Sequence, residues 1–420
     1  MDVAERMTVA NSWPALGVAR VPYWVYSDKE NYARELDRIF YGPYWQFVGI
    51  DTEIPNAGDY KRAVIGERSV LMVRADDGSI SVLLNSCSHR GVELCQAKFG
   101  RQKPIVCPYH QWSYDLKGNL AGVPFRKGVQ GQGGYPPDFD VKQHGLKKLV
   151  VENVNGVVFA SFDSGVRPFA EAVGPDVYGW MTRLFDGRKV RVLGYQRQRL
   201  KCNWKLYMEN LKDSYHATLL HVFLISFGLY RAGQKGLSLQ DDDTHAHSIF
   251  AASRTEQAEE LGAEGEMKSL RENLVLKDPS MLAAVKEFPD NTTLVNHAIF
   301  PNFVAQQQSN SLQIRNVIPL GVDEFELSWT YFGYADDDAE MTLRRLRQAN
   351  LTGAAGYVSV DDSEVLEYSG TGIRPNPNGI GVLELGGREP VTPADSPVMT
   401  SEGPIRGFYD HYCSVMGLSS

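Results

Sequence analysis

The 420-residue chain lacks an excess of basic residues: 43 Lys and Arg stand against 51 Asp and Glu, which gives a net charge of −8. Proteins that bind nucleic acids normally carry a basic surface, so this balance argues against a nucleic-acid partner. The chain has no run of about 18 apolar residues, and we therefore expect no membrane-spanning helix. The N-terminal stretch MDVAERMTVANSW also lacks the basic start and apolar centre that are typical of a signal peptide.

Cysteine is scarce as well, with five residues in the whole chain: Cys87, Cys95, Cys107, Cys202 and Cys413. An odd and sparse set argues against a disulfide framework and favours reduced thiols or metal ligands. These features predict a cytoplasmic protein. The apolar fraction of 43% and the charged fraction of 22% are ordinary for globular proteins, and the length allows two or three domains.

Hairpin signals dominate residues 40–163. Apolar, β-forming runs surround an Asp-Asp-Gly turn in residues 69–85, a Lys-Gly-Asn turn in residues 112–120 and an Asn-Gly turn in residues 149–162. We therefore expect a small antiparallel β-domain over residues 40–163.

The pattern changes in residues 164–420, for which we expect a larger α+β domain on which residues 1–39 pack. Residues 204–224 lack Gly and Pro and predict one helix, and a second long helix is expected from Asp338 to about residue 368. Residues 293–334 return to strand-like runs. The polar segment 233–292, which includes TEQAEELGAEGEMKSLRENL, suggests an exposed helix that acts as a lid or as a subunit contact.

Two short stretches of the β-domain each carry one cysteine and one histidine. They are CSHRG, with Cys87 and His89, and CPYHQW, with Cys107 and His110. Any one of these residues alone would be read as part of an ordinary core, but four in paired spacing beside Gly or Pro indicate metal ligands. A structural zinc site is one candidate, although zinc ligands usually follow Cys-x₂₋₄-Cys or His-x₃₋₅-His spacing. The other is a dinuclear iron–sulfur cluster with two thiolates on one iron and two imidazoles on the other.

A second set of candidate ligands lies in ENLKDSYHATLLH, where Asp213 and His216 are three residues apart and would share a helix face. His221 would lie about 140° further round an ideal helix than His216. Both imidazoles can therefore meet one ion only if the helix bends or the ion lies toward the helix end. Surface histidines are the alternative. A carboxylate from VSVDDSEVLEY, which holds Asp361 and Asp362, would complete a 2-His-1-carboxylate iron site.

The first motif resembles a Rieske [2Fe–2S] site, and both motifs in this order resemble the catalytic α subunit of the Rieske non-haem iron ring-hydroxylating oxygenases. The resemblance implies a Rieske domain over residues 40–163 and a catalytic domain over residues 164–420, whose curved antiparallel sheet is packed by helices in a helix-grip arrangement. It also implies two cofactors, a [2Fe–2S] cluster and a mononuclear Fe²⁺.

The resemblance assigns roles to individual residues. The cluster ligands are expected to be Cys87, His89, Cys107 and His110. The family pattern around the mononuclear iron maps onto Glu209, Asn210, Asp213, His216 and His221, one residue tighter than usual. The third ligand falls on Asp362, with Glu367 as the marker five residues on and Asp361 as the fallback. Asp213 is expected to bridge a Rieske histidine of a neighbouring subunit, the equivalent of His110, to His216 of its own chain.

The likeness is strongest to the members that act on aromatic carboxylates, the salicylate, anthranilate and terephthalate group. Arg315 matches the position that holds a substrate carboxylate there, and its alternative is a structural ion pair. Asn210 and His297 are further candidates for substrate contact, although a satisfied core histidine is the competing interpretation of His297. Met399 stands where terephthalate oxygenases have a second arginine, which favours a monocarboxylate over a dicarboxylate such as terephthalate.

The resemblance predicts a terminal oxygenase component that hydroxylates an aromatic ring with O₂ and with NAD(P)H electrons supplied through a reductase, a ferredoxin or both. It implies an α₃ or α₃β₃ oligomer, the second containing a small β subunit. Mono- and dioxygenation both stay open, as does O- or N-demethylation. A Rieske electron-transfer protein is the non-enzymatic alternative, which the 250 or so residues after the β-domain argue against.

Overall fold

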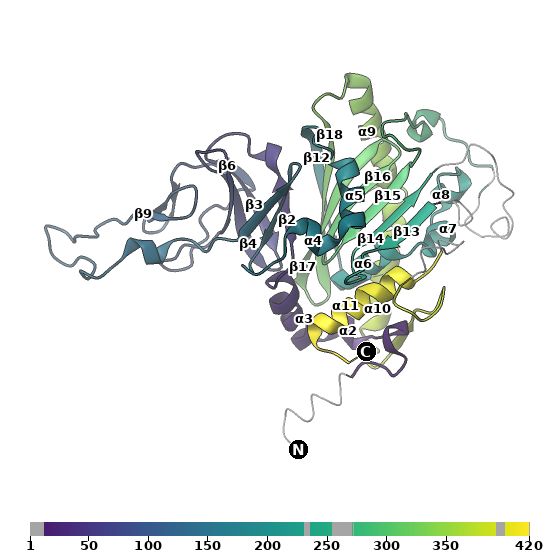
Figure 1. Ribbon diagram of the computed structural model, residues 1–420, viewed down its shortest axis with the longest axis horizontal. Coiled ribbons are helices and arrows are strands. Elements are labelled where there is room, and N and C mark those ends of the chain that lie inside the picture. The colour runs from purple at the N-terminus through teal and green to yellow at the C-terminus, as the bar shows by residue number, and fades with distance from the viewer. Residues whose placement is uncertain (1–11, 231–235, 254–270, 272, 392–399, 420) are drawn as a thin grey trace, which may run out of the picture. The chain divides into compact units, whose positions relative to one another are not determined.

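The computed structural model describes residues 12–230, 236–253, 271, 273–391 and 400–419. The chain divides into two compact units, one made of residues 40–168 and the other of residues 1–39 and 169–420 (Figure 1). Each unit has its own sheets and its own core.

The unit of residues 40–168 is built from small antiparallel sheets. Its four-stranded sheet has the order β5-β4-β3-β6, with bounds Ile80–Leu84, Arg68–Arg74, Asp59–Ile65 and Phe99–Arg101. A three-stranded sheet has the order β10-β11-β2, with bounds Val150–Val154, Val157–Ser161 and Gln46–Ile50. The third sheet has the order β7-β8-β9, with bounds Ile105–Val106, Ser113–Tyr114 and Leu120–Gly122.

The three predicted hairpins are confirmed as the pairs β4–β5, β8–β9 and β10–β11. In the last of them Val154 pairs with Val157, so the loop consists of Asn155 and Gly156 alone. Both loop residues have positive φ, 49° and 99°. This is the backbone that a two-residue hairpin turn requires, which explains why Asn-Gly was an effective signal.

One seven-stranded antiparallel sheet forms the centre of the second unit, in the order β12-β18-β17-β16-β15-β14-β13. The bounds in that order are Val190–Leu200, Glu324–Tyr334, Ser311–Gly321, Phe303–Gln308, Leu294–Ile299, Ser248–Ala252 and Gly236–Gln240. Strands β13 to β18 follow each other as neighbours, and β12 adds to the far side of β18. With its helices, this sheet confirms the expected α+β class.

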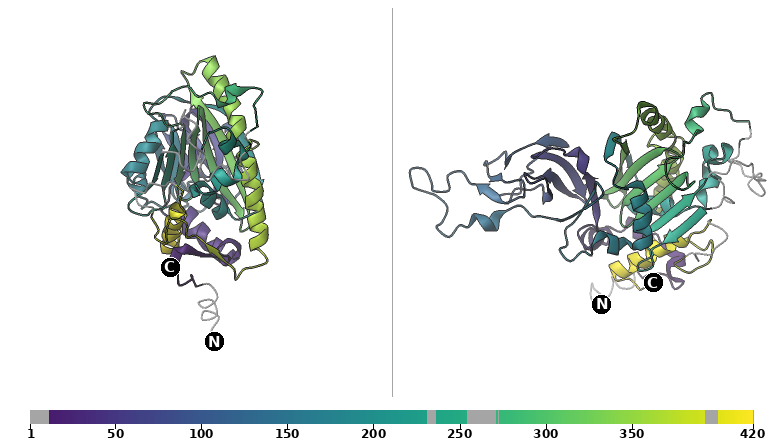
Figure 2. Two further views of the ribbon diagram at one scale, coloured as in Figure 1. Left: turned by 90° about the vertical axis from the view of Figure 1, so that its right-hand side faces the viewer. Right: turned by 45° about the horizontal axis from the view of Figure 1, so that its top comes forward.

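Helices cover both faces of this sheet. The bounds of the helices are α2 Trp24–Ser27, α3 Lys29–Glu35, α4 Phe169–Val173, α5 Pro175–Leu184, α6 Trp204–Lys212, α7 His216–Leu220, α8 Val222–Ser226, α9 Ala339–Thr352, α10 Ser359–Ile373 and α11 Gly403–Met416. Helix α5 packs on β14 and β15, and α6 packs on β15 and β17 and against α10. Figure 2 shows helices on the two sides of the sheet. Within the described part of the chain, no helix combines the length and apolar character needed to cross a bilayer.

The single helix predicted over residues 204–224 is wrong, because the structure has three short helices there: α6, α7 and α8. Asp213 ends α6 in an extended conformation, and its Oδ1 accepts the backbone N–H of Tyr215 at 2.7 Å. This local bond competes with continuation of the helix. His221 is also extended, with φ −87° and ψ 91°, and separates α7 from α8. The bend that the two histidines required is therefore made by two breaks.

The second long helix is also interrupted, by residues 353–358 between α9 and α10. A Cβ at Gly356 would lie 2.5 Å from the carbonyl carbon of Leu351, so the chain returns against α9 at a distance that only glycine allows. The helix predicted within 233–292 falls largely on residues outside the described ones. Its described flanks include β13 and β14.

A buried carboxylate joins the N-terminal segment to α6 and α11. Glu35 accepts hydrogen bonds from Lys205 Nζ at 2.6 Å, Trp204 Nε1 at 2.9 Å and Tyr412 OH at 2.6 Å. Both Glu35 and Lys205 are fully buried. Removing one partner of such a pair would leave a buried charge uncompensated. Because Trp204 and Lys205 are the first two residues of α6, this network holds the start of α6 against the N-terminal segment.

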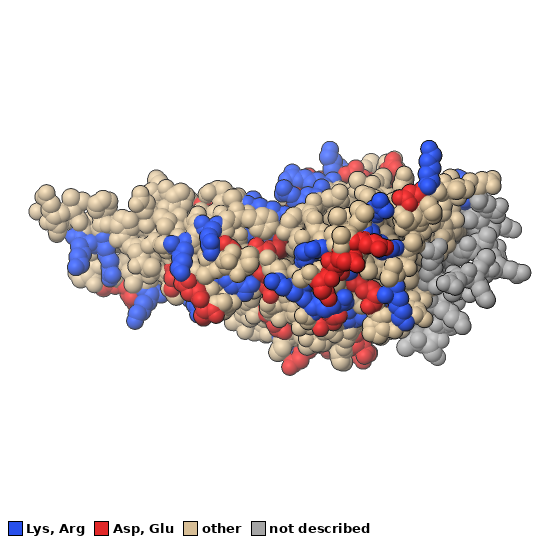
Figure 3. Space-filling model, turned by 90° about the horizontal axis from the view of Figure 1, so that it is seen from above, with Lys and Arg blue, Asp and Glu red and all other residues tan. Residues whose placement is uncertain are grey.

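Acidic and basic side chains lie close to one another on the face drawn in Figure 3. Ion pairs among the described residues of the whole chain include Lys117 with Asp77 at 2.6 Å and Arg183 with Asp290 at 2.6 Å. Charges of opposite sign at this spacing largely cancel each other's field at longer range.

Candidate metal centres

The two Cys/His stretches form tight turns with the same backbone pattern. In the first, Gly91 N–H donates to Cys87 O at 2.8 Å, and in the second, Gln111 N–H donates to Cys107 O at 3.1 Å. The residue that closes each turn has positive φ, 72° at Gly91 and 57° at Gln111. The second turn joins β7 to β8, and the first follows β5. Both turns therefore start at the cysteine, and the histidine is the second residue after it in the first turn and the third in the second.

These turns bring the four predicted cluster ligands together. Cys87 and Cys107 are buried, at 3% and 1% exposure, and the His89 and His110 rings lie 4.6 Å apart between centroids. Nδ1 of His89 is buried and has no hydrogen-bond partner among the described residues. Burial and the neighbouring His110 lower the pKa of His89, which favours the neutral imidazole that a metal requires.

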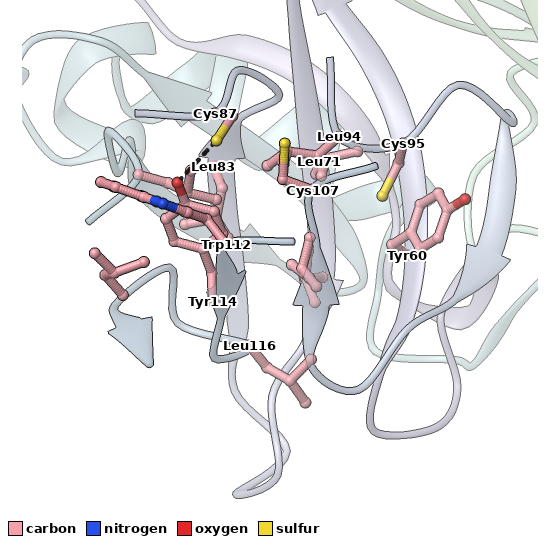
Figure 4. Close-up of a cluster of buried hydrophobic side chains, with 14 of the residues drawn as sticks. Tyr60, Leu71, Leu83, Cys87, Leu94, Cys95, Cys107, Trp112, Tyr114 and Leu116 are labelled. Atoms are coloured by element: carbon pink, nitrogen blue, oxygen red, sulfur yellow. Dashed lines mark hydrogen bonds between the residues drawn. The ribbon is translucent and has the colours of Figure 1, made fainter. Parts of the chain in front are cut away.

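The two cysteines lie in a mainly apolar cluster, in which Tyr114 contacts Cys87 through its hydroxyl (Figure 4). Tyr114 accepts the N–H of Ser88 at 3.1 Å, which leaves its hydroxyl proton for Cys87 Sγ at 3.2 Å. Trp112 stacks on His89 with 4.8 Å between the ring centroids and shields that side of the site. Burial raises the pKa of the Cys87 thiol, so the thiolate form depends on a bound metal. Two thiols, two imidazoles and an unpartnered nitrogen fit a Rieske cluster.

The second set of ligands comes together in the other unit. His216 begins α7, His221 lies between α7 and α8, and Asp362 lies in the first turn of α10. Each offers a ligand atom, and these atoms all lie within 4.8 Å of one another. Oδ1 of Asp362 lies 3.4 Å from Nε2 of His216 and 3.2 Å from Nε2 of His221. The Nε2 atom of each imidazole therefore points to a common centre.

The opposite nitrogen of each histidine faces a carboxylate of its own. Nδ1 of His216 lies 3.2 Å from Asp213 Oδ2, and Nδ1 of His221 lies 3.3 Å from Asp361 Oδ2. Metal-bound histidines usually have such outer partners, which fix the orientation of the ring. Asp362 thus stands at the inner position and Asp361 at the outer one. Glu367 points elsewhere, since its Oε1 accepts the N–H of Lys201 at 2.9 Å.

Electrostatics at this centre favour a cation. Burial alone would lower the pKa of His216, but hydrogen bonds to Asp213 and Asp362 raise that pKa to about 10. The pKa of Asp362 is held far below its usual range by the two histidines, against the effect of burial. A divalent metal would replace the protons at this site, so metal affinity is expected to fall as the pH falls.

A cavity lies beside the second centre, between α6, α10 and the sheet. Asn210, His216, His221 and Asp362 line one side of it, and Arg315 lies on the sheet side. Nδ2 of Asn210 donates to Asp362 Oδ1 at 3.1 Å and lies 3.3 Å from His216 Nε2. Asn210 therefore stands where cavity and candidate ligands meet.

Arg315 is the buried cation of this cavity. It is 4% exposed, its Nη1 donates to Tyr207 OH at 2.8 Å, and its Nη2 donates to Gln306 Oε1. The Trp329 ring lies 4.9 Å from the guanidinium. Among the described residues no Asp or Glu forms an ion pair with Arg315, and its Nε is buried without a partner. The alternative interpretation of Arg315, a structural ion pair with Asp or Glu, therefore finds no partner among the described residues.

The structure does not bring His297 to the cavity. Its Nε2 lies 2.8 Å from Trp180 O of α5, and its Nδ1 lies 3.1 Å from Ala305 O. Burial lowers the pKa of His297 to about 4 in spite of these carbonyls. Because neighbouring residues of a strand face opposite sides of a sheet, His297 faces α5 while Asn296 faces the cavity.

The sequence analysis did not identify three further residues of these sites. Tyr114 and Gln306 carry no motif, and only the strand register places them beside Cys87 and Arg315. Asn296 had a usable signal, the alternation of residues in LVNHAIF. Met399 lies outside the described residues.

Family models match most of the chain. The Rieske [2Fe-2S] domain matches residues 44–133, and the ring hydroxylating alpha subunit (catalytic domain) matches residues 186–418. These matches include all four predicted cluster ligands in the first segment and both histidines, Asp213 and Asp362 in the second.

Curated relatives extend over nearly the whole length. The large oxygenase component of salicylate 5-hydroxylase from Ralstonia sp. is 46% identical, and the alignment covers 96% of each chain. The large subunit of anthranilate 1,2-dioxygenase from Burkholderia cepacia is 41% identical, with 95% of this chain and 94% of the relative covered. The terminal oxygenase component subunit alpha 2 of terephthalate 1,2-dioxygenase from Comamonas sp. is 39% identical, with 96% and 97% covered.

A solved structure of naphthalene 1,2-dioxygenase from Rhodococcus sp. shares the fold, with a TM-score of 0.78, 24% identity and 94% of each chain covered. Fold, family models and relatives agree, and they exclude an isolated Rieske electron carrier and a structural zinc protein. The chain belongs to the catalytic α subunits of the ring-hydroxylating oxygenases, oxidoreductases that carry a Rieske [2Fe–2S] cluster and a mononuclear non-haem iron.

Proposed function

We propose that this oxygenase hydroxylates the ring of an aromatic monocarboxylate and that Arg315 binds the carboxylate. The observation that carries the proposal is a buried guanidinium beside the candidate iron site with no acidic partner among the described residues. The three relatives named above act, by their names, on salicylate, anthranilate and terephthalate, all of which are aromatic carboxylates.

The physical reason is the cost of a buried charge without a counter-ion. Tyr207 and Gln306 supply neutral oxygens to Arg315, which satisfy two nitrogens but leave the positive charge uncompensated. A substrate carboxylate would supply the missing negative charge and could accept a bond from the unpartnered Nε. Planar guanidinium and carboxylate groups bind each other through two parallel hydrogen bonds, which would also orient the ring.

Within the same proposal, Cys87, His89, Cys107 and His110 hold the cluster, and His216, His221 and Asp362 hold the iron. When bound, the cluster would supply single electrons and the iron would bind and activate O₂. The protein's own residues position these groups. Asn210 keeps Asp362 in place through its 3.1 Å bond, and Arg315 holds the ring to be hydroxylated.

Asp213 has a second role in the proposal, as the contact between two copies of the chain. One carboxylate oxygen faces His216, and the side chain remains about one quarter exposed. A Rieske histidine of a neighbouring copy would bind the exposed part, as the family resemblance implies. The oxygenase would then act as an α₃ or α₃β₃ assembly in the cytoplasm, with electrons from NAD(P)H through a reductase, a ferredoxin or both.

Replacement of Arg315 tests the proposal. We expect Arg315→Leu to weaken benzoate binding about 100-fold or more, because charge-assisted bonds in a buried site are lost. Benzamide has the same shape without the charge, and its affinity should change little. Arg315→Lys should give an intermediate result, since it keeps the charge but loses the planar fork. The dissociation constants would be measured by anaerobic calorimetry.

Two controls accompany this comparison: iron content and thermal unfolding of each variant. Equal losses for benzoate and benzamide would mean that the cavity has collapsed. Unchanged benzoate affinity in Arg315→Leu would contradict the proposal, because the substrate carboxylate would then be bound elsewhere.

A further inference from the structure

The floor of the cavity contains one row of side chains that crosses four strands. Register pairs Ser238 with Phe250, Phe250 with Asn296, and Asn296 with Gln306. Residues directly opposite each other in antiparallel strands project to the same face. All four residues line the cavity, so the row runs across its floor from β13 to β16.

Asn296 is the residue of this row with an unsatisfied amide. Its Oδ1 is buried, and its side chain has no hydrogen bond to any described residue. Its neighbour Gln306 is engaged, because Oε1 of Gln306 accepts from Arg315 and from Gln313. Burying an amide oxygen without a hydrogen bond is unfavourable, and native proteins usually satisfy such groups with protein, water or ligand.

The position of Asn296 relative to Arg315 indicates what the partner is. Asn296 lies directly opposite Gln306, and Gln306 binds the guanidinium that is proposed to hold the carboxylate. Side chains paired in this way are about 4.5–5.5 Å apart at Cβ. An aromatic ring whose carboxylate is bound by Arg315, beside Gln306, can therefore also reach Asn296. Phe250, on the other side of Asn296, offers an apolar ring surface.

We infer that Asn296 recognises a hydroxyl or amino substituent on the ring of the substrate, and so selects hydroxy- and aminobenzoates over unsubstituted and alkyl-substituted benzoates. This inference rests on the proposed function of Arg315 and narrows its substrate class. A hydroxyl or amino group can donate to Oδ1 or accept from Nδ2. The amide can rotate to present either atom, because rotation breaks no bond to a described residue. A methyl group or a hydrogen can do neither.

The test compares affinities of ring-substituted benzoates for the full-length protein. The ligands are the 2- and 3-hydroxybenzoates, 2-aminobenzoate, benzoate and 2-methylbenzoate, titrated anaerobically by calorimetry. We expect the wild type to bind at least one hydroxy- or aminobenzoate about tenfold more tightly than benzoate, a ratio typical of one net hydrogen bond. In Asn296→Leu this ratio should fall to about one, while the affinity for benzoate itself is retained.

A matched control is available on the same sheet. Asn316 also has a buried amide oxygen without a partner, but it lies outside the residues that line the cavity. Asn316→Leu should therefore leave the ratio unchanged. If Asn296→Leu does not fold, Asn296→Ala removes the same amide without adding bulk and should give the same ratio.

Different outcomes separate this inference from the proposed function. If the benzoates bind and depend on Arg315, but Asn296→Leu keeps the wild-type ratio or weakens all ligands equally, the role of Asn296 is refuted and that of Arg315 stands. If the wild type binds benzoate as tightly as every substituted acid, the inference fails in the same way. If no acid binds, or if binding does not depend on Arg315, both are overturned.

Discussion

Asp213→Asn is expected to retain both metal centres and to lose at least about 100-fold in the rate of product formation, the upper end of effects for residues that orient a metal ligand. The carboxylate accepts two backbone N–H groups at the break after α6 and faces His216 at 3.2 Å. An amide has nearly the same shape, so the turn should survive. The charge that would join two histidines across a subunit contact is lost. Product formation would be measured with the electron-donor components, alongside iron content and the visible spectrum.

Asp361→Asn is a matched control for this variant. Asp361 faces Nδ1 of His221 at 3.3 Å, nearly the same distance as Asp213 from His216, and it is also partly exposed. If Asp213 only orients its histidine, the two variants should lose similar activity. A much larger loss in Asp213→Asn supports the bridge between subunits. Equal rates in Asp213→Asn and the wild type would remove Asp213 from the electron path.

Asp362→Ala should abolish binding of the mononuclear iron, whereas Asp361→Ala should weaken it about 10–100-fold, the usual effect of an outer partner. The structure separates the two aspartates clearly: Asp362 lies between both Nε2 atoms, and Asp361 faces an Nδ1. Loss of Asp362 leaves two imidazoles and no carboxylate, which removes the negative charge that a divalent ion requires. Iron and acid-labile sulfide would be quantified, because sulfide reports the cluster independently.

The expected numbers of iron and sulfide per chain distinguish the two variants. Asp362→Ala should keep two irons and two sulfides per chain from the cluster and lose the third iron. Asp361→Ala should keep all three irons at saturating Fe²⁺. If instead Asp361→Ala loses the third iron and Asp362→Ala keeps it, the two assignments are reversed.

Much of the Rieske-like unit was predictable because its signals are local. The Asn155-Gly156 turn requires positive φ at two residues, and that pair of residues supplies it. The Cys/His turns were equally visible, since spacing and turn residues lie within a few positions of each other. The equivalence of Gly91 and Gln111 was hidden, because a positive φ at Gln111 has no sequence signal.

The sequence pointed to the three residues that the structure brings together at the candidate iron site, but not to the backbone that brings them together. Residues 204–224 have helix-forming composition throughout, and only a side-chain bond at Asp213 and an extended residue at His221 break the helix. On the sheet, a one-residue difference separates His297, which faces α5, from Asn296, which faces the cavity. The sequence analysis chose His297 as a candidate for substrate contact and missed Asn296. Adjacent residues of a strand face opposite sides of the sheet, and the sequence does not say which side faces the cavity.

A single turnover in ¹⁸O₂ tests the central claim most directly. The protein, loaded with both metal centres, would be reduced without oxygen, mixed with benzoate, salicylate, anthranilate or terephthalate, and then exposed to labelled oxygen. We predict a ring-hydroxylated monocarboxylate that contains ¹⁸O, one atom for a monooxygenase and two for a dioxygenase, and no product in Arg315→Leu. Oxidation of both metal centres without a labelled product from benzoate, salicylate or anthranilate, or with a labelled product from terephthalate alone, would contradict the assignment of an aromatic monocarboxylate as the substrate.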